Sequence, residues 1–511
     1  MHQRSPSGHY NGIVIRGRRW PGALGASLLL WASFFPGLGW LAWLALVPFL
    51  WALDGAGTKR GVGLGALCGV VFFGLEFSSL SSLSPFAGAM VIPMCLALAV
   101  YGGLFLALFG AVAGRWSSPL VWAGGWVLVE ALRAAGPLGV TLGSVPGTMA
   151  GGPFLPAAAW GGPWLLSLGV AWTAGCLACG VRNRRWLPWA ALGPLVLFIV
   201  SLIPSGTRDG GTLTVALIQP NIPKLEQLDP NLLPGHLALY RELLSQVPPP
   251  VDLIALPENV RPWLRDEREH LALFQDAAVE VGASVLVGTA EFRDGKIYNT
   301  VLVLSPRGEV MGTYAKTRLV PFGEYVPGRG LWEKIGLGPL ISPLLPFDQT
   351  PGEEVRPVGN LGIMICFEST FPGVSRALAQ AGAEVLLVPT NDAWFGETRL
   401  LWEHYALGAL RAAETGRALV QIGQTGVSGA WGPDGRELQR LPPWTRGVLP
   451  LTVSLHQGLT PYARVGDLPV LLLAGLILVF GLKKGPTGVG PGKPRRSAAT
   501  RVKAPPAPPR W

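Results

Sequence analysis

The chain opens with long apolar stretches that are separated by short polar or basic loops. A helix that crosses a bilayer needs roughly 20 mostly apolar residues. Seven stretches before residue 205 approach this length, and an eighth follows a long polar region near the end. The predicted spans are 21–35, 36–53, 61–82, 88–114, 118–134, 155–180, 186–204 and 468–482. The pattern therefore predicts a multispan α-helical membrane domain of about eight spans.

Residues 205–465 follow a different pattern, in which short β-rich runs alternate with helical stretches. Apolar runs of the kind that are buried on both faces predict the strands. These strands are expected at 212–219, 251–258, 284–291, 299–305, 361–368 and 383–390, with helices at 271–281, 371–381 and 402–415. Such an alternation predicts a layered α/β domain.

The composition agrees with a membrane protein, since 49% of residues are hydrophobic and only 14% are charged. The formal net charge of +10 comes from the two ends of the chain. Residues 1–20 carry four Lys or Arg and residues 483–511 carry eight, without an acid in either segment. This distribution indicates cytoplasmic anchors beside a membrane, and we expect no nucleic-acid partner.

The charges of the loops predict the orientation of the chain. Basic residues at 59–60, at 115 and at 182–185 fall in every second loop, on the same side as both basic ends. Because cytoplasmic loops carry the excess of Lys and Arg, both termini are expected in the cytoplasm. The α/β region 205–465 is then extracytoplasmic. The first 20 residues are too polar for a signal peptide, so the first span is expected to stay as an anchor.

These observations divide the chain into five expected parts. They are a basic cytoplasmic N-terminus at 1–20, a transmembrane region at 21–204, an extracytoplasmic catalytic domain at 205–465, a last span at 466–482 and a basic tail at 483–511. The tail is rich in Gly, Pro and Ala, a composition that predicts disorder.

Three reactive side chains stand at the ends of predicted strands. Cys366 closes the apolar run from residue 362, Glu258 ends the run from residue 251, and Lys316 follows a strand-like segment. A thiol, a carboxylate and an amine in such places suit a nucleophile, a base and an electrophilic stabiliser. Because a free thiol has a pKa of about 8.5, it needs a nearby base to react at neutral pH.

The remaining cysteines and the histidines predict no further chemistry. Cys366 is the lone thiol of the α/β region, so no structural disulfide is expected there. Cys176 and Cys179 have the spacing of a redox or metal pair, but their apolar helical setting favours packing. The six histidines, His404 among them, show no ligand spacing. Neither a metal nor a cofactor is expected.

Three sequence blocks are similar to the catalytic blocks of the nitrilase, or carbon-nitrogen hydrolase, superfamily. They are ALPEN at 255–259, YAKTRLVPFGEYVP at 314–327 and ICFES at 365–369. Together with the spans, PTNDAWFG at 389–396 and QGLTPYARVGD at 457–467, they make the chain resemble the apolipoprotein N-acyltransferase family. The resemblance implies a nitrilase-like αββα sandwich on the outer face of a bacterial cytoplasmic (inner) membrane.

The resemblance also implies a ping-pong N-acyltransferase that uses a Glu-Lys-Cys triad. A phospholipid's acyl chain would pass to Cys366 as a thioester and then to the α-amino group of the diacylglyceryl-cysteine of an apolipoprotein. Glu258 would be the general base, and Lys316 the cation that stabilises the tetrahedral oxyanion. The implied partners are the phospholipid donor, the apolipoprotein acceptor and the membrane lipids, and we expect a monomer.

Three further residues near the triad receive supporting roles. Glu324 matches an essential polar residue of the family, although a loop acid paired with an arginine is the alternative. Glu368 matches an acid two places after the nucleophile, and a supporting role is favoured over a chemical one. The backbone N–H of Phe367 could join Lys316 in stabilising the oxyanion.

The chain departs from the family pattern at four positions. Phe367 stands where a Tyr is frequent, and Leu228 stands about where a Trp is usual. Gln421 and Gln424 replace an Arg and an Asn. At these positions the chain is not expected to use a tyrosine hydroxyl or a tryptophan stacking contact, and two contacts to a lipid headgroup are in doubt. None of the four departures changes Glu258, Lys316 or Cys366.

Two other segments are candidates for contact with lipid. The insertion 328–347 concentrates apolar residues, and we expect Leu331, Trp332 and Ile335 to form a lid in the outer leaflet. The alternative is that this segment packs on the domain's own core. Glu130 and Arg133 are costly to bury in a span, so they are either a structural pair or a headgroup site.

Two other functions remain open at this point. A membrane-tethered amidase or nitrilase-type hydrolase would use the same three residues, with water in place of the amine. A multispan lipid-binding or transport protein with an inactive outer domain is disfavoured, because all three reactive residues are intact. The apolar spans favour lipid substrates over soluble amides.

Overall fold

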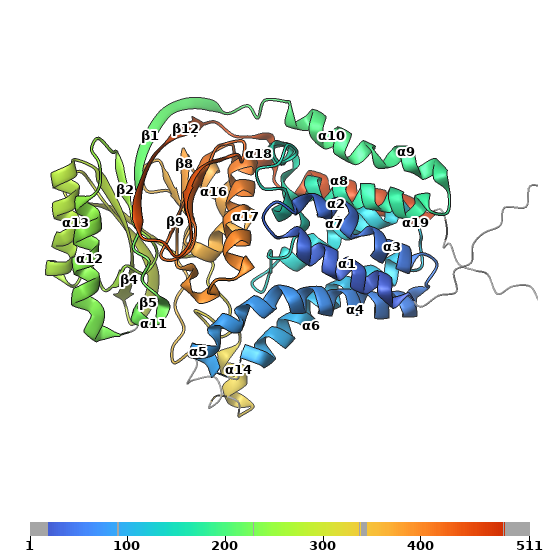
Figure 1. Ribbon diagram of the computed structural model, residues 1–511, viewed down its shortest axis with the longest axis horizontal. Coiled ribbons are helices and arrows are strands. Elements are labelled where there is room, and N and C mark those ends of the chain that lie inside the picture. Colours follow the sequence, from blue (N-terminus) through green and yellow to red (C-terminus); the bar gives the residue numbers. More distant parts are fainter. Residues whose placement is uncertain are drawn as a thin grey trace, which may run out of the picture.

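The computed structural model describes residues 19–88, 91–227, 229–336, 338, 345–483 and 485. A helical part and an α/β part lie side by side in it (Figure 1). The basic N-terminus and most of the C-terminal tail lie outside the described residues, so the prediction of a disordered tail stays a prediction.

Helices occupy every stretch that the hydrophobic pattern assigned to a span. They are α1 (Trp20–Ser33), α2 (Ala42–Ala45), α3 (Val47–Leu53), α4 (Thr58–Phe77), α6 (Val91–Ala113), α7 (Pro119–Ala134), α8 (Ala158–Gly180), α9 (Leu187–Ala190), α10 (Leu192–Ser201) and α19 (Leu468–Lys483), while α5 (Ser84–Ala87) lies between two of the stretches. Three described helical segments are long and apolar enough to cross a membrane: Thr58–Leu83, Val91–Ala113 and Leu155–Gly180. Gly39–Leu53 and Leu468–Lys483 are shorter apolar segments. The count of eight spans stays a prediction.

Helices α4 and α6 pack closely because glycines line their contact. A Cβ atom on Gly61 would lie 2.0 Å from the carbonyl oxygen of Gly110, and one on Gly65 would lie 2.1 Å from that of Leu106. No larger residue fits at these positions. Small residues allow helix backbones to approach in this way in membrane proteins.

The α/β part contains two sheets. The larger sheet has the strand order β12-β1-β2-β4-β5-β6, with β3 beside β4, and the smaller has the order β11-β10-β9-β8-β7. Their bounds are β1 (Arg208–Gln219), β2 (Leu253–Ala255), β3 (Arg261–Pro262), β4 (Ser284–Arg293), β5 (Lys296–Leu304), β6 (Val310–Ala315), β7 (Leu361–Ile363), β8 (Val385–Thr390), β9 (Ala418–Gly423), β10 (Ser428–Trp431), β11 (Glu437–Leu441) and β12 (Gly447–Gln457).

The two sheets face each other, and helices cover both outer faces. Apolar side chains of both sheets, such as Leu286 and Leu387, form one core between them. Helices α12 (Leu233–Ser245) and α13 (Arg268–Val281) cover the larger sheet, while α16 (Pro372–Gln380) and α17 (Arg399–Thr415) cover the smaller one (Figure 1). The predicted αββα layering is confirmed. The α17 face also joins the core of the helical part.

Two predicted strands end earlier than expected. The run that was predicted as a strand at 361–368 is a strand only at Leu361–Ile363, and the run at 251–258 only at Leu253–Ala255. The residues that follow leave the sheet although they are apolar, and this carries Glu258 and Cys366 beyond the strand ends. The sequence pattern also missed α12 and several strands of both sheets, including β9 to β12.

Candidate active site

The structure brings the three predicted reactive residues together at neighbouring strand ends. Glu258 follows β2, Lys316 follows β6 directly, and Cys366 begins the 3-10 turn η8 (Cys366–Thr370) after β7. The Lys316 Nζ atom lies 3.3 Å from Glu258 Oε1 and 2.8 Å from Glu324 Oε1. Lys316, Glu258 and Glu324 are buried. The Lys316 ammonium also interacts electrostatically with the Cys366 thiol.

Two asparagines that the sequence reasoning missed hold the acids in place. The Asn299 side-chain amide donates to Glu258 Oε1 at 2.7 Å and to Glu324 Oε1 at 3.1 Å. The backbone N–H of Asn391 donates to Glu258 Oε2 at 2.9 Å. Asn299 lies in β5, and its carbonyl accepts from the Lys316 N–H at 2.8 Å. The only sequence signal for Asn299 was that a polar side chain stands inside an apolar strand.

The Cys366 backbone has a left-handed conformation, with φ of 49°. A residue other than glycine pays about 1–3 kcal/mol for such a conformation, which persists only where the surroundings impose it. Here the Ser369 hydroxyl donates to the Cys366 carbonyl at 2.8 Å, inside the same turn. Cys366 is a free thiol and is partly buried.

The surroundings set the resting charges of the thiol and the amine. Burial raises the pKa of the Cys366 thiol well above its usual value, and the Glu258 carboxylate raises it further, against the effect of Lys316. Burial alone would lower the pKa of Lys316, but Glu258 and Glu324 together outweigh burial and raise it. At neutral pH the thiol therefore keeps its proton and the amine is charged. A base has to remove the proton during the reaction.

Glu368 holds the nucleophile turn against the loop after β6. Its carboxylate accepts from the Tyr314 hydroxyl at 2.9 Å, from the Thr317 hydroxyl at 2.6 Å and from the Ile365 N–H at 2.8 Å. The side chain is fully buried, and this burial raises the pKa of Glu368, while the hydrogen bond from Thr317 acts in the opposite direction. With its oxygens occupied, Glu368 is placed to support the turn.

Among the described residues, Glu324 bonds to Lys316 and Asn299 and to no arginine. Besides Lys316 and Asn299, it accepts from the backbone N–H of Val320 at 2.7 Å through Oε2. Each carboxylate oxygen of Glu324 thus has a donor. In the part of the chain that the structure describes, Glu324 is therefore not a loop acid paired with an arginine.

The positions that depart from the family pattern lie around the site. The Phe367 ring packs edge-on against Phe371, with 4.9 Å between ring centroids. Gln421 and Gln424 are buried inside the catalytic domain, where Gln421 Nε2 donates to the Val427 carbonyl and Gln424 lies 3.3 Å from the Tyr240 hydroxyl. Leu228 lies outside the described residues.

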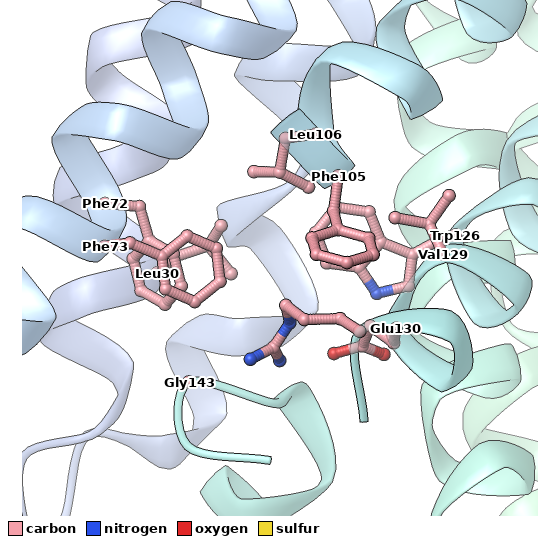
Figure 2. Close-up of a pocket in the computed structure, with 10 residues that line it drawn as sticks. Leu30, Phe72, Phe73, Phe105, Leu106, Trp126, Val129, Glu130 and Gly143 are labelled. Carbon is pink, nitrogen blue, oxygen red and sulfur yellow. The ribbon is translucent and has the colours of Figure 1, made fainter. Parts of the chain in front are cut away.

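Glu130 and Arg133 bind backbone groups and the hydroxyls of Ser167 and Ser144. Glu130 accepts from the Val145 N–H at 2.9 Å, and Arg133 donates to the carbonyls of Val140 and Leu142 at 2.9 and 2.6 Å. In the described part of the chain the two side chains form no ion pair with each other. Figure 2 shows Glu130 in a pocket whose wall includes Phe72, Phe73, Phe105 and Trp126. Both residues contact the loop after α7. Their roles as a structural pair or as a headgroup site stay predictions.

The predicted lid segment begins with α14 (Arg329–Lys334). The side chains of Leu331 and Ile335 are 63% and 58% exposed, and the Trp332 indole N–H donates to the Pro327 carbonyl at 2.9 Å. Residues 337 and 339–344 lie outside the described residues. The exposed side chains of Leu331 and Ile335 do not pack on the core of the domain.

A histidine that was set aside for lack of ligand spacing also lies at the site. The Cys366 sulfur, a carboxylate oxygen of Asp392 and a ring nitrogen of His404 all lie within 4.8 Å of one another. His404 Nδ1 is 2.9 Å from Asp392 Oδ1, and Nε2 is 2.9 Å from the Ser369 hydroxyl. Both ring nitrogens are therefore engaged by protein atoms. The sequence could not reveal this contact, because it joins α17 to a turn 38 residues earlier.

The fold and the site define an enzyme of the carbon-nitrogen hydrolase superfamily that is joined to a helical membrane part. Residues 214–458 match the carbon-nitrogen hydrolase family, and residues 26–176 match the apolipoprotein N-acyltransferase N-terminal domain. An apolipoprotein N-acyltransferase from Azotobacter vinelandii is 34% identical over 432 residues, which cover 78% of this chain and 80% of the relative. One from Pseudomonas aeruginosa is 31% identical and covers 91% of this chain and 96% of the relative.

The chain belongs to the apolipoprotein N-acyltransferase family. Among solved structures, an amidase from Nesterenkonia sp. aligns with 52% of this chain and 98% of its own, with 22% sequence identity and a TM-score of 0.37.

Proposed function

We propose that the protein transfers an acyl chain from a membrane phospholipid to the N-terminal α-amino group of diacylglyceryl-cysteine in apolipoproteins. The observation that carries this proposal is the buried cluster of Glu258, Lys316 and Cys366 in a chain whose relatives bear that name. The helical part supports it as well, because both proposed substrates are held in a bilayer.

In the first half-reaction the Cys366 sulfur attacks the carbonyl carbon of the phospholipid ester. Glu258 takes the thiol proton as the carbon–sulfur bond forms, and Lys316 stabilises the oxyanion together with the backbone N–H of Phe367. The tetrahedral intermediate then loses the lysophospholipid alkoxide. This leaving group takes the proton from Glu258, and a thioester remains on Cys366.

In the second half-reaction the uncharged α-amino group of the acceptor attacks the thioester carbon. Glu258 accepts a proton from the nitrogen, and the carbon–sulfur bond breaks as the amide forms. The proton on Glu258 returns to the Cys366 sulfur, so the enzyme is regenerated. No oxidant, reductant or cofactor is needed, and the order of substrates is ping-pong.

The same proposal includes the placement of the chain in the membrane. The helical segments 21–204 and 466–482 would cross the bacterial cytoplasmic membrane, with both termini in the cytoplasm and the domain 205–465 outside. The loop charges support this orientation. The exposed Leu331 on α14 and Ile335 directly after it support a lid that dips into the outer leaflet, since neighbouring exposed apolar side chains suit contact with lipid.

The test is to incubate the detergent-purified protein with phospholipid that carries a labelled acyl chain. We expect intact-protein mass spectrometry to find one acyl group on Cys366 before acceptor is added. A synthetic diacylglyceryl-cysteine peptide should then remove the label and become an amide. Cys366→Ser should show neither event, because a serine hydroxyl is far less ionised and a weaker nucleophile.

The result also separates acyl transfer from hydrolysis. Labelled free fatty acid as the main product, with acceptor present, would identify a hydrolase that uses water in place of the amine. Full transfer activity in Cys366→Ser would remove this cysteine from the mechanism.

A further inference from the structure

His404 on α17 contacts the backbone of the proposed nucleophile. Its Nε2 atom lies 3.1 Å from the Cys366 carbonyl oxygen and 2.9 Å from the Ser369 hydroxyl. On the other side of the ring, Nδ1 lies 2.9 Å from Asp392 Oδ1, which also accepts from the Thr390 hydroxyl at 2.9 Å. His404 and Asp392 are buried. The ring thus joins a buried acid to the turn that carries the thiol.

The partners of the ring determine where its protons are. A carbonyl oxygen can only accept a hydrogen bond, and the Ser369 hydroxyl already donates its proton to that same carbonyl. The Nε2 atom must therefore carry a proton to bond to either group. A carboxylate also only accepts, so Nδ1 carries a proton as well. Burial alone would lower the pKa of His404, but Asp392 outweighs burial and raises it.

The bond to Cys366 falls where the backbone is strained. Because Cys366 has a φ of 49°, its peptide group needs outside contacts to hold its orientation. The Cys366 carbonyl receives the His404 N–H from α17 and the Ser369 hydroxyl from the turn itself. The contact from α17 ties the turn to the body of the domain. Loss of that contact frees the thiol to move away from Glu258 and Lys316.

The charge of the ring also matters for the thiol. The ionisable groups that face His404 are Asp392 from the turn η9 (Asp392–Phe395), Cys366, and Glu258 from the loop after β2. The Cys366 thiol in turn feels the acids Glu258 and Asp392 and the cation Lys316. A neutral residue at position 404 leaves Asp392 without its cationic partner beside a sulfur that has to become an anion.

We propose that His404, oriented by Asp392, is a positioning residue for the acyl transfer: its protonated ring fixes the Cys366 carbonyl and compensates the charge of Asp392. The inference depends on Cys366 being the nucleophile of the function proposed above. It adds a second cation to the site beside Lys316. This cation acts through the nucleophile turn and not on the substrate.

The test measures the reactivity of the thiol directly. In detergent, the rate of Cys366 alkylation by iodoacetamide is followed by mass spectrometry over a range of pH, for the unmodified protein, His404→Gln and Asp392→Asn. In His404→Gln the amide can still donate to the carbonyl, but the charge is gone. We expect the alkylation midpoint of His404→Gln to rise by about one pH unit, because a nearby cation favours the thiolate.

Turnover is measured beside alkylation. His404→Gln should lower kcat by about ten- to a hundredfold, the usual effect of losing a charged hydrogen bond, and should leave KM for phospholipid nearly unchanged. Asp392→Asn is nearly isosteric and should lower kcat by less, because the ring keeps its place but loses its countercharge. Its alkylation midpoint should not rise, because the change also removes an acid that raises the pKa of the Cys366 thiol. His270→Gln, in the distant helix α13, is the control and should change neither value.

Two outcomes would overturn the inference. One is an unchanged alkylation midpoint in folded His404→Gln, and the other is a rise in KM without a fall in kcat in either variant. Variants that lose their tryptophan-fluorescence melting transition are excluded as unfolded, and the kcat of the isosteric Asp392→Asn then decides. Because alkylation needs no lipid substrate, its result does not depend on the proposed function. Failure of that function would appear separately, as turnover by Cys366→Ser.

Discussion

In each of two buried clusters of this chain, two glutamates form ion pairs with one cationic side chain. In the catalytic domain Lys316 pairs with Glu258 and Glu324. At the junction with the helical part, Arg399 of α17 pairs with Glu403 on the same helix and with Glu76 of α4. All six side chains are buried. Composition and burial alone do not distinguish these clusters.

The hydrogen bonds around the acids distinguish them. In the catalytic cluster each oxygen of Glu258 and Glu324 accepts from a fixed donor, namely Asn299, Lys316, or a backbone N–H of Asn391 or Val320. In the junction cluster Glu403 accepts from the Gly143 N–H at 2.6 Å. No backbone or amide donor in the described chain holds Glu76, whose carboxylate lies against Arg399 and Glu403.

The two arrangements suit different tasks. A base that must take and return a proton needs a fixed position beside a reactive atom, and the amide donors provide this for Glu258. An arginine between two acids on different elements joins those elements, which is what Arg399 does between α4 and α17. A buried acid–cation cluster is therefore not evidence of an active site until a reactive neighbour such as Cys366 is found beside it.

The largest effect is expected for Glu258→Gln, which keeps the shape of the acid but removes the base. The burial-raised pKa of Cys366 means that the thiol cannot react without proton removal. We expect thioester formation from phospholipid to slow by about 10²–10⁴-fold. Rapid-quench mass spectrometry of Cys366 gives this rate. A normal burst of acyl-enzyme in this variant would mean that another base acts.

Lys316→Met should have the next largest effect, because it keeps much of the stem's bulk and removes the charge. Loss of one oxyanion-stabilising group typically costs about 10²–10³-fold in rate. Both half-reactions pass through an oxyanion, so acylation and deacylation should slow together. Single-turnover measurement of each step checks this. A change in only one step would contradict the role given to Lys316.

The lid residues should affect only the lipid substrate. Replacing Leu331, Trp332 and Ile335 together by Ser removes side chains that could each contribute about 1.5–3 kcal/mol in lipid. The rate with phospholipid in vesicles should fall by about tenfold or more. Each tenfold loss of rate corresponds to about 1.4 kcal/mol of lost interaction free energy. Acylation of Cys366 by a small water-soluble thioester should be spared.

A matched control for the lid uses apolar residues that are equally exposed elsewhere on the catalytic domain. Val279 and Phe292 are 59% and 60% exposed, and their replacement by Ser should leave both rates unchanged. Equal losses with both donors in the lid variant, or no loss with either, would show that the segment is not a lid.

The same contrast explains how much could be predicted from the sequence. The apolar helices, the layered α/β class and the residues Glu258, Lys316 and Cys366 were visible, because apolar runs mark elements and reactive groups followed those runs. The αββα sandwich came from the family resemblance. Asn299, Asp392 and His404 were not visible. Each acts through a contact with another segment, and no local spacing records which segments the fold brings together. The partnership of Glu76 with Arg399 was hidden for the same reason, since the two lie in different parts of the molecule.

The smallest effect on catalysis, but a clear one on stability, is expected at the junction cluster. Arg399→Met leaves Glu76 and Glu403 as buried acids without their cation, and breaking a buried pair in this way costs about 3–5 kcal/mol. We expect the tryptophan-fluorescence melting midpoint in detergent to fall by several degrees. The rate per folded molecule should stay close to that of the unmodified protein.

The triple variant Glu76→Gln, Arg399→Met, Glu403→Gln removes the acids together with the cation, so it should melt above Arg399→Met alone. Arg436→Met, which removes an exposed partner of Asp434, is the control and should melt normally. If the triple variant melts lower than Arg399→Met, the acids stabilise the junction by themselves and the unpaired-charge explanation is wrong.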